Sequence, residues 1–150
     1  MELVIGCDHA AIDAKTEIVQ YLKSLGHDII DEGTHSLESV DYPDYAAKVS
    51  QKVQSGVAER GILICGTGLG MSIAANRFQG IRAALCFTEE LAELSRLHND
   101  ANVLCLGARI VGPEPVKEIV EAFLGARFVG NDAGEERHAR RVNKVRILEG

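Results

Sequence analysis

The chain has 150 residues, enough for one domain with a hydrophobic core. Its formal net charge of −6 argues against nucleic acid as the main partner, because phosphate backbones attract an excess of lysine and arginine. No apolar run approaches the roughly 20 residues needed to cross a bilayer. The start, Met1-Glu2-Leu3-Val4, lacks the basic segment of a signal peptide. We therefore expect a single cytoplasmic domain spanning residues 1–150, with no membrane partner.

Apolar runs alternate with segments of helical periodicity along the whole chain. In chain order we expect a strand at 3–5, a helix at 10–25, a strand at 28–31, a helix at 43–55, a strand at 62–65, a helix from the following glycine turn to about 77, a strand at 81–85, a helix at 88–98, a strand at 103–106, and helices at 114–124 and 135–144. Gly6 is expected to halt the first strand, and Thr88 to cap its helix.

This alternation predicts βαβ units, and the nearly continuous apolar strands indicate a sheet that is covered on both faces. The sequence therefore predicts an α/β, three-layer, Rossmann-like (flavodoxin-like) fold with a five-stranded parallel sheet. Ligands of such sheets bind beyond the carboxyl ends of the strands, where the strand order reverses. In the order 2-1-3-4-5, the first and third strands are neighbours, so the Asp8-His9 loop faces the loop that begins at Cys65. Arg109 emerges at the same edge.

The third strand ends on a cysteine that a glycine-rich turn follows, Cys65-Gly-Thr-Gly-Leu-Gly70. Backbone N–H groups at the start of the next helix attract anions and favour a thiolate. A thiolate beside such donors can act as base or nucleophile while the amides stabilise developing negative charge. Other glycine-loop readings fit less well: Met71 replaces the last glycine of GxGxxG and the arginine of a cysteine phosphatase, and no P-loop lysine follows.

The remaining cysteines and histidines do not form a metal pattern. No CxxC pair is present and the histidines are scattered, so we expect no metal site. Disulfides are not expected in a reducing cytosol. Cys86 and Cys105 lie in apolar, strand-like runs, where cysteine behaves as a small hydrophobic residue. Cys7 is left open, because it closes the first strand beside Asp8, which is itself either a site residue or a helix N-cap.

Two further polar clusters lie in the second half of the chain. The run from His98 to Asn102 precedes the fifth strand, at the amino edge of the sheet and opposite Cys65. It is either a helix C-terminal cap or part of a neighbouring subunit's site. Near the end, Arg137 and Arg141 are four residues apart, on one helical face, and two such guanidiniums can grip a phosphate. A solvated basic face is the alternative. The clusters together suit an anionic small molecule.

At these residues the sequence closely resembles the type B ribose-5-phosphate isomerases and their relatives, the galactose-6-phosphate isomerase subunits. The resemblance covers the whole chain in order. It is carried by Gly6-Cys7-Asp8-His9-Ala10, Asp41-Tyr42-Pro43-Asp44, residues 65–76, Gly80-Ile-Arg-Ala-Ala84, His98-Asn-Asp-Ala-Asn102, Leu106-Gly-Ala-Arg109 and Arg137-His-x-x-Arg141.

The resemblance implies an aldose–ketose isomerase that acts on a sugar phosphate, without metal or cofactor, as a homodimer or a dimer of dimers. By this analogy Cys65 is the base that moves a proton between C1 and C2, and Thr67 supports it. The other implied roles fall into three groups: backbone amides that hold the enediolate oxygens (Gly66, Gly68, Leu69 and Gly70), side chains at the sugar hydroxyls (Asp8, Tyr42 and His98, with His98 also assisting ring opening), and phosphate ligands (His9, Arg109, Arg137 and Arg141).

The preferred interpretation is interconversion of D-ribose 5-phosphate and D-ribulose 5-phosphate, in the pentose phosphate pathway. The alternatives are an isomerase of a six-carbon sugar phosphate, such as allose 6-phosphate or galactose 6-phosphate, and a non-catalytic metabolite-binding module. Two departures from the family pattern stand out: Cys7 replaces a small residue, and Glu135-Glu136 replaces Gly-Gly. These carboxylates either weaken the phosphate clamp or act as its structural partners.

A catalytic His98 has a consequence for assembly. One chain can hardly bring it to Cys65, because the two residues lie at opposite edges of the predicted sheet. A partner subunit would then supply His98 and Asn99 in trans, and the sites would lie at the interface of a symmetric dimer.

Overall fold

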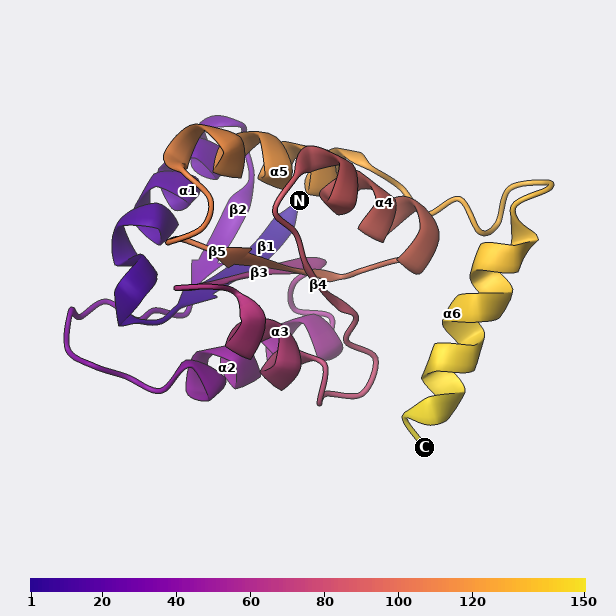
Figure 1. Ribbon diagram of the computed structural model, residues 1–150, viewed down its shortest axis with the longest axis horizontal. Helices are drawn as coiled ribbons and strands as arrows, with labels where there is room; N and C mark the ends of the chain where they lie inside the picture. The colour runs from indigo at the N-terminus through magenta and orange to yellow at the C-terminus, as the bar shows by residue number, and fades with distance from the viewer.

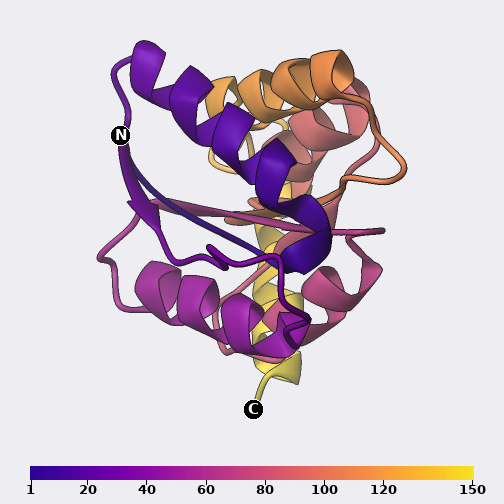
Figure 2. The same ribbon diagram turned by 90° about the vertical axis from the view of Figure 1, so that its left-hand side faces the viewer.

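Five parallel strands form one sheet at the centre of the structure, a computed structural model that describes residues 1–150. In chain order the elements are β1 Glu2–Cys7, a 3₁₀ turn His9–Ala11, α1 Ile12–Ser24, β2 Asp28–Asp31, α2 Tyr42–Gln54, β3 Arg60–Cys65, α3 Leu69–Ala75, β4 Ala83–Leu85, α4 Glu89–Asn99, β5 Val103–Gly107, α5 Pro113–Gly125 and α6 Glu136–Leu148. Helices α1, α4 and α5 cover one face of the sheet, and α2 and α3 cover the other (Figures 1 and 2). The three-layer α/β fold with a five-stranded parallel sheet is confirmed.

The strand order is β2-β1-β3-β5-β4, so the expected order 2-1-3-4-5 is wrong at one edge. Strand β5 has five buried residues, whereas β4 has three residues that are only partly buried. A short and less buried strand suits the edge of a sheet, and β5 takes the place beside β3. The neighbouring positions of β1 and β3, on which the site prediction depends, are as expected.

Two hydrophobic cores lie on the two faces of the sheet. One joins Leu3, Ile5, Ile62 and Leu104 to the apolar sides of α1 and α5, and the other joins the opposite faces of the strands to α2 and α3. Both faces of β1, β3 and β5 are therefore buried, which explains their continuous apolar sequence.

Two strand boundaries differ from the predictions for local reasons. Gly6 does not halt β1, which continues to Cys7. A Cβ added at Gly6 would lie 2.9 Å from Cγ2 of Val49, so the glycine lets α2 pack closely on the strand. β4 begins two residues later than expected, because side-chain amides take its first N–H groups: the Oδ1 atom of Asn102 accepts from Arg82, at 2.8 Å. The Thr88 cap is confirmed by its bond from Leu91 N–H, at 3.2 Å.

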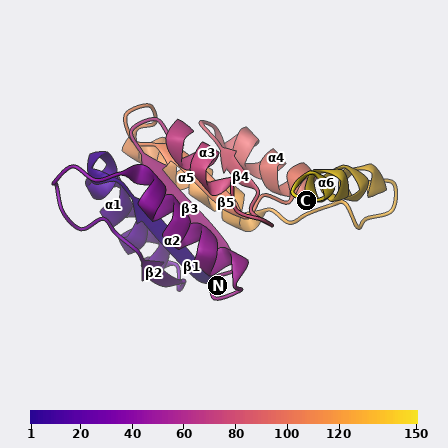
Figure 3. The same cartoon turned by 90° about the horizontal axis from the view of Figure 1, so that it is seen from below.

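Helix α6 projects beyond the three layers and packs on α4 (Figures 1 and 3), and Glu149 at its end accepts a hydrogen bond from the amide of Gly80 at 3.0 Å. Its last turns carry apolar side chains in solvent; Ile147 and Leu148 are 76% and 85% exposed. The helix is also longer than predicted, because its basic and apolar residues continue to Leu148.

Cys86 and Cys105 are buried free thiols, and burial raises the pKa of both, that of Cys86 to about 11. The expectation that they are inert core residues therefore fits their surroundings. We predict that Cys105→Ala lowers the free energy of unfolding by about 1 kcal/mol, because it removes one fully buried atom and leaves a small cavity. Urea denaturation measures this change, and an unchanged midpoint would contradict the packing described here.

Candidate active site

The loops that follow β1, β3 and β5 meet at the carboxyl edge of the sheet. Ile64 is paired with Cys7, and Cys65 with Gly107, so the three strands end at the same level. Backbone bonds continue past these ends: the amide of Asp8 donates to Ile64 O at 3.2 Å, and that of Arg109 donates to Gly66 O at 3.0 Å. The geometry therefore brings together the Asp8-His9 loop, the Cys65 loop and Arg109, as the sequence predicted.

Cys65 is 5% exposed and lies against the glycine turn. The backbone N–H of Gly68 donates to its Sγ atom at 3.1 Å. Gly68 has φ +77°, and a Cβ there would lie 2.5 Å from Cδ1 of Leu85, so only glycine presents its amide in this way. Thr67 is exposed beside the turn, and its hydroxyl accepts from the amide of Leu69 at 3.2 Å.

Two glycines let larger side chains approach the turn. A Cβ added at Gly70 would lie 2.6 Å from Cζ of Tyr42, so the phenol ring rests on the start of α3. A Cβ at Gly66 would lie 3.2 Å from Nη1 of Arg109, which crosses the turn from the other side. Tyr42, Arg109 and Cys65 thus lie around one glycine turn, although they come from distant parts of the chain.

The Asp8-His9 loop is held in a defined conformation. Asp8 is 8% exposed, and its Oδ1 atom accepts from the amide of Ala10 at 3.0 Å, so the N-cap interpretation is correct in the structure. The ring Nδ1 atom of His9 accepts from the amide of Val40 at 3.1 Å. A neutral His9 therefore carries its proton on Nε2, which can donate to a ligand.

Lys15, which was not among the predicted site residues, holds the segment that runs beside this loop. The side chain is 2% exposed and pairs with Asp31 at 2.8 Å, while its ammonium also donates to Thr34 O at 2.9 Å. The same segment bonds the end of β1, since the amide of Thr34 donates to Cys7 O at 2.8 Å. Cys7 is buried, and burial raises the pKa of its thiol to about 11. We therefore assign Cys7 a packing role. The sequence signal for this role is that Lys15 lies on the same helical face as the apolar Ile18.

His98 and Asn99 lie at the other edge of the sheet, at the end of α4. Since a strand rises about 3.3 Å per residue, the five residues of β5 separate the two edges by roughly 13 Å. Within one chain, Cys65 and His98 therefore belong to two separate groups of residues. His98 instead stacks on His138, with ring centroids 4.2 Å apart and an interplanar angle of 2°. Burial lowers the pKa of His138, and the adjacent His98 lowers it further.

Asp100 fixes the backbone directly after His98 and Asn99. It caps α4 in the left-handed conformation, with φ +50°. Its carboxylate pairs with Arg82 and with Arg96, each at 2.9 Å. The polar run from His98 to Asn102 therefore divides: Asp100 and Asn102 hold the chain, as the capping interpretation expected, while the side chains of His98 and Asn99 remain for other roles.

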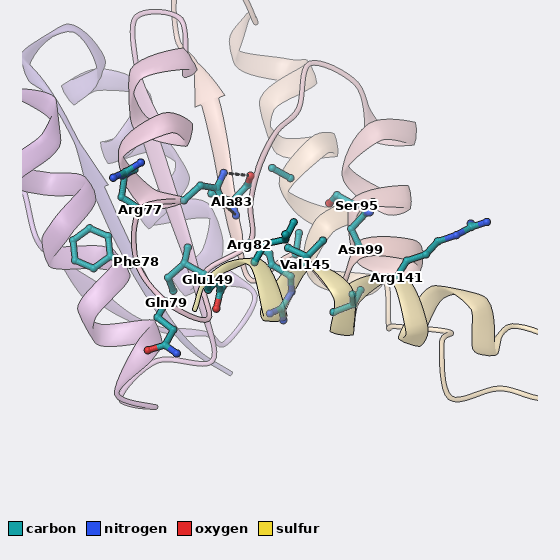
Figure 4. A pocket seen from close by; sticks show the side chains of 16 residues that line it. Arg77, Phe78, Gln79, Arg82, Ala83, Ser95, Asn99, Arg141, Val145 and Glu149 are labelled. Atoms are coloured by element: carbon teal, nitrogen blue, oxygen red, sulfur yellow. Dashed lines mark hydrogen bonds between the residues drawn. The ribbon is translucent and has the colours of Figure 1, made fainter.

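Arg137 and Arg141 flank His138 along α6, so the stack also brings these two arginines towards His98 and Asn99. We call these residues together the amino-edge group. A cavity of about 730 Å³ lies beside this group, between α6 and the segment that leads into β4 (Figure 4). Asn99 and Arg141 border it, but no residue of the Cys65 loop does. No group of His, Cys, Asp and Glu side chains is arranged to hold a metal ion. None of the helices has the length and apolar character needed to span a membrane.

Comparison with known proteins defines the class to which this fold and site belong. The model of the Ribose/Galactose Isomerase family matches residues 3–145, nearly the whole chain. The chain therefore belongs to this family of isomerases.

The chain is also similar to individual relatives over nearly their whole length. The chain is 49% identical to ribose-5-phosphate isomerase B of Escherichia coli K12, over 99% of this chain and 96% of that protein. Among solved structures, ribose-5-phosphate isomerase B of Clostridium thermocellum matches with a TM-score of 0.95 and 51% identity, covering 99% of this chain and 97% of that one. The ribose 5-phosphate isomerase of Thermotoga maritima matches with a TM-score of 0.91 and 51% identity, covering 97% of both chains.

The Asp100 network generates a prediction about stability. Asp100→Ala should lower the free energy of unfolding by about 3 kcal/mol, because it removes the carboxylate partner of the buried Arg96 and because alanine tolerates the left-handed conformation less well than aspartate. Asp100→Gly loses the same ion pairs but tolerates the backbone conformation, so it should destabilise less. Urea denaturation of both variants separates these two contributions. Wild-type stability of Asp100→Ala would show that the network does not hold the end of α4.

Proposed function

We propose that this isomerase interconverts D-ribose 5-phosphate and D-ribulose 5-phosphate, with Cys65 as the base. The observation that carries the proposal is the Gly68 amide, which donates to the Cys65 sulfur at 3.1 Å at the carboxyl edge of the sheet. An N–H donor aimed at sulfur stabilises a thiolate, the form that can accept a proton. The relatives named above, close to half identical over their whole length, support the choice of substrate.

In the proposed reaction, the Cys65 thiolate removes the proton from C2 of the open-chain aldose. The electron pair of that bond becomes the C1–C2 double bond of an enediolate, and the carbonyl oxygen takes up negative charge. Backbone amides of the turn stabilise this oxygen, those of Gly66 and Gly70 directly, whereas the amides of Gly68 and Leu69 already donate to Cys65 and Thr67. Thr67 borders the base. Return of the proton to C1, with transfer of a hydroxyl proton from O2 to O1, gives the ketose. The substrate is oxidised at C2 and reduced at C1, so no external redox cofactor is needed.

We further propose that each active site is shared by two subunits. The carboxyl-edge group supplies Cys65 and the side chains around it, among them Asp8, His9, Tyr42 and Arg109. The partner supplies the amino-edge group, in which His98 assists ring opening, Asn99 binds the sugar, and Arg137 and Arg141 bind phosphate. The support is the separation of the two groups by roughly the length of β5, together with their complementary chemistry.

Exposed apolar side chains support a homodimer or a dimer of dimers. Ile73 on α3 is 67% exposed, and Leu69 lies beside it at the edge of the Cys65 turn. Val145, Ile147 and Leu148 extend the apolar surface of α6. Burial of such surface against a second copy stabilises an assembly, and twofold symmetry would place two equivalent sites at one interface. The protein is proposed to act in the cytoplasm, where its four free cysteines would remain reduced.

A ketose assay with ribose 5-phosphate tests the proposed activity. We predict that the wild-type protein converts this substrate and that Cys65→Ala lowers kcat by about 10²–10⁴-fold, the usual contribution of a general base. The variant should fold normally, because the change removes one sulfur atom at the edge of the core.

Cys105→Ala is the matched control, since it removes a second buried thiol that lies outside the site. It should leave turnover of the folded protein unchanged. A near-normal kcat in Cys65→Ala would contradict the assignment of the base. Comparison of kcat/KM for ribose 5-phosphate, allose 6-phosphate and galactose 6-phosphate tests the sugar length, and a higher value for a six-carbon substrate would overturn the choice of a pentose phosphate.

A further inference from the structure

Arg137 already has an anionic partner within its own chain. Its Nη2 atom lies 3.0 Å from Oε2 of Glu135, and its Nη1 atom donates to Gly134 O at 3.0 Å. The same carboxylate oxygen lies 3.2 Å from Nε2 of His138, the ring that stacks on His98. The Glu135 carboxylate is therefore in contact with Arg137 and with the histidine that joins α6 to His98.

Arg141 differs from Arg137 in this respect. It makes no ion pair, and its side chain extends away from the body of the protein (Figure 4). One arginine of the pair is therefore free to receive an anion, while the other is paired with a carboxylate. A guanidinium bonds carboxylate and phosphate oxygens through the same fork of N–H donors, so the two anions compete for it.

Glu136, the neighbouring acidic residue, has a different role. Its Oε2 atom accepts from the amide of Gly134 at 3.0 Å, and hydrogen bonds from its own backbone and from Gly134 lower its pKa. It makes no ion pair with either arginine. Glu136 thus fixes the turn that begins α6, whereas Glu135 acts on Arg137. The two adjacent carboxylates provide equal charges in nearly the same place with different contacts.

We propose that Glu135 sets the phosphate affinity of the site: its carboxylate is the resident counter-ion of Arg137, and the phosphate group of a substrate must displace it to bind. This inference rests on the proposed function, in which Arg137 binds the phosphate. Displacement weakens the binding of every anion to Arg137 by the same factor, because only the molecules in which Glu135 has released the guanidinium can bind one. The acidic residue therefore lowers the affinity of the site for phosphate.

The test measures the dissociation constant of inorganic phosphate by calorimetry, and KM and kcat for ribose 5-phosphate, in Glu135→Gln and Glu136→Gln. Both variants lose one negative charge, so long-range electrostatics change equally. Glu135→Gln should bind phosphate about two- to five-fold more tightly than Glu136→Gln, the range expected for an exposed ion pair, and should lower KM with kcat unchanged. Acetate should inhibit more strongly by a similar factor, because Glu135 opposes every anion at Arg137 alike.

A double-mutant cycle completes the test. Arg137→Ala should weaken phosphate binding, and in that background Glu135→Gln should have no larger effect than Glu136→Gln. Equal phosphate affinity in Glu135→Gln and Glu136→Gln would overturn the proposal, as would weaker binding in Glu135→Gln, which would mean that Glu135 orients Arg137 for its ligand. Unchanged phosphate binding in Arg137→Ala would also overturn it. Absence of turnover in the wild-type protein would instead refute the proposed function, since the phosphate titrations do not depend on catalysis.

Discussion

The parallel pairing of β3 between β1 and β5 is the constraint on which the rest of the structure depends. It places Cys65, Cys7 and Gly107 at one level, so that three loops with different chemistry leave the sheet side by side. The apolar residues that fill both faces of these strands stabilise the pairing, and the loops beyond them are polar. The Cys65 thiol is thereby held at a fixed place beside the backbone N–H of Gly68.

Glycines let other parts of the chain approach the backbone closely at this edge of the sheet. Gly66, Gly70 and Gly107 allow Arg109, Tyr42 and Thr67 to approach where a β-carbon would collide with them. On the outer side, the buried ammonium of Lys15 ties the segment that contains Asp31 and Thr34 to helix α1, which follows the loop of Asp8 and His9. These features explain why the sequence around the turn is so rich in glycine, and why a lysine is tolerated inside the protein: its charge is paired and hydrogen-bonded.

Helix α4 imposes the second constraint, because its antiparallel path over the sheet delivers His98 to the edge opposite Cys65. The ion pairs of Asp100 with Arg82 and Arg96 hold the end of this helix. Helix α6 docks there through the His98–His138 stack and brings its arginines to the same group. The folded chain thus offers two partial sites, and the proposed dimer joins one from each subunit.

Much of this arrangement could be predicted from the sequence, because strand hydrophobicity and glycine positions are local signals. The alternation of apolar runs gave the parallel sheet, and the Cys65 turn indicated its functional edge. The exchange of β4 and β5 was not predictable in this way, since it depends on which strand the helices leave more deeply buried. The Lys15–Asp31 pair and the His98–His138 stack were also missed, because each joins residues that are distant in sequence. For Glu135 and Glu136, only side-chain contacts could separate two adjacent, chemically identical residues.

The central claim is that a complete site contains residues of two subunits, and complementation between inactive variants tests it most directly. Cys65→Ala and His98→Ala proteins are mixed, and subunit exchange is verified by mass spectrometry of the assembled species. Activity should return to about a quarter of the wild-type level. Half of the randomly mixed dimers contain both variants, and each of these has one intact site out of two. No recovery of activity after complete exchange would contradict the shared site.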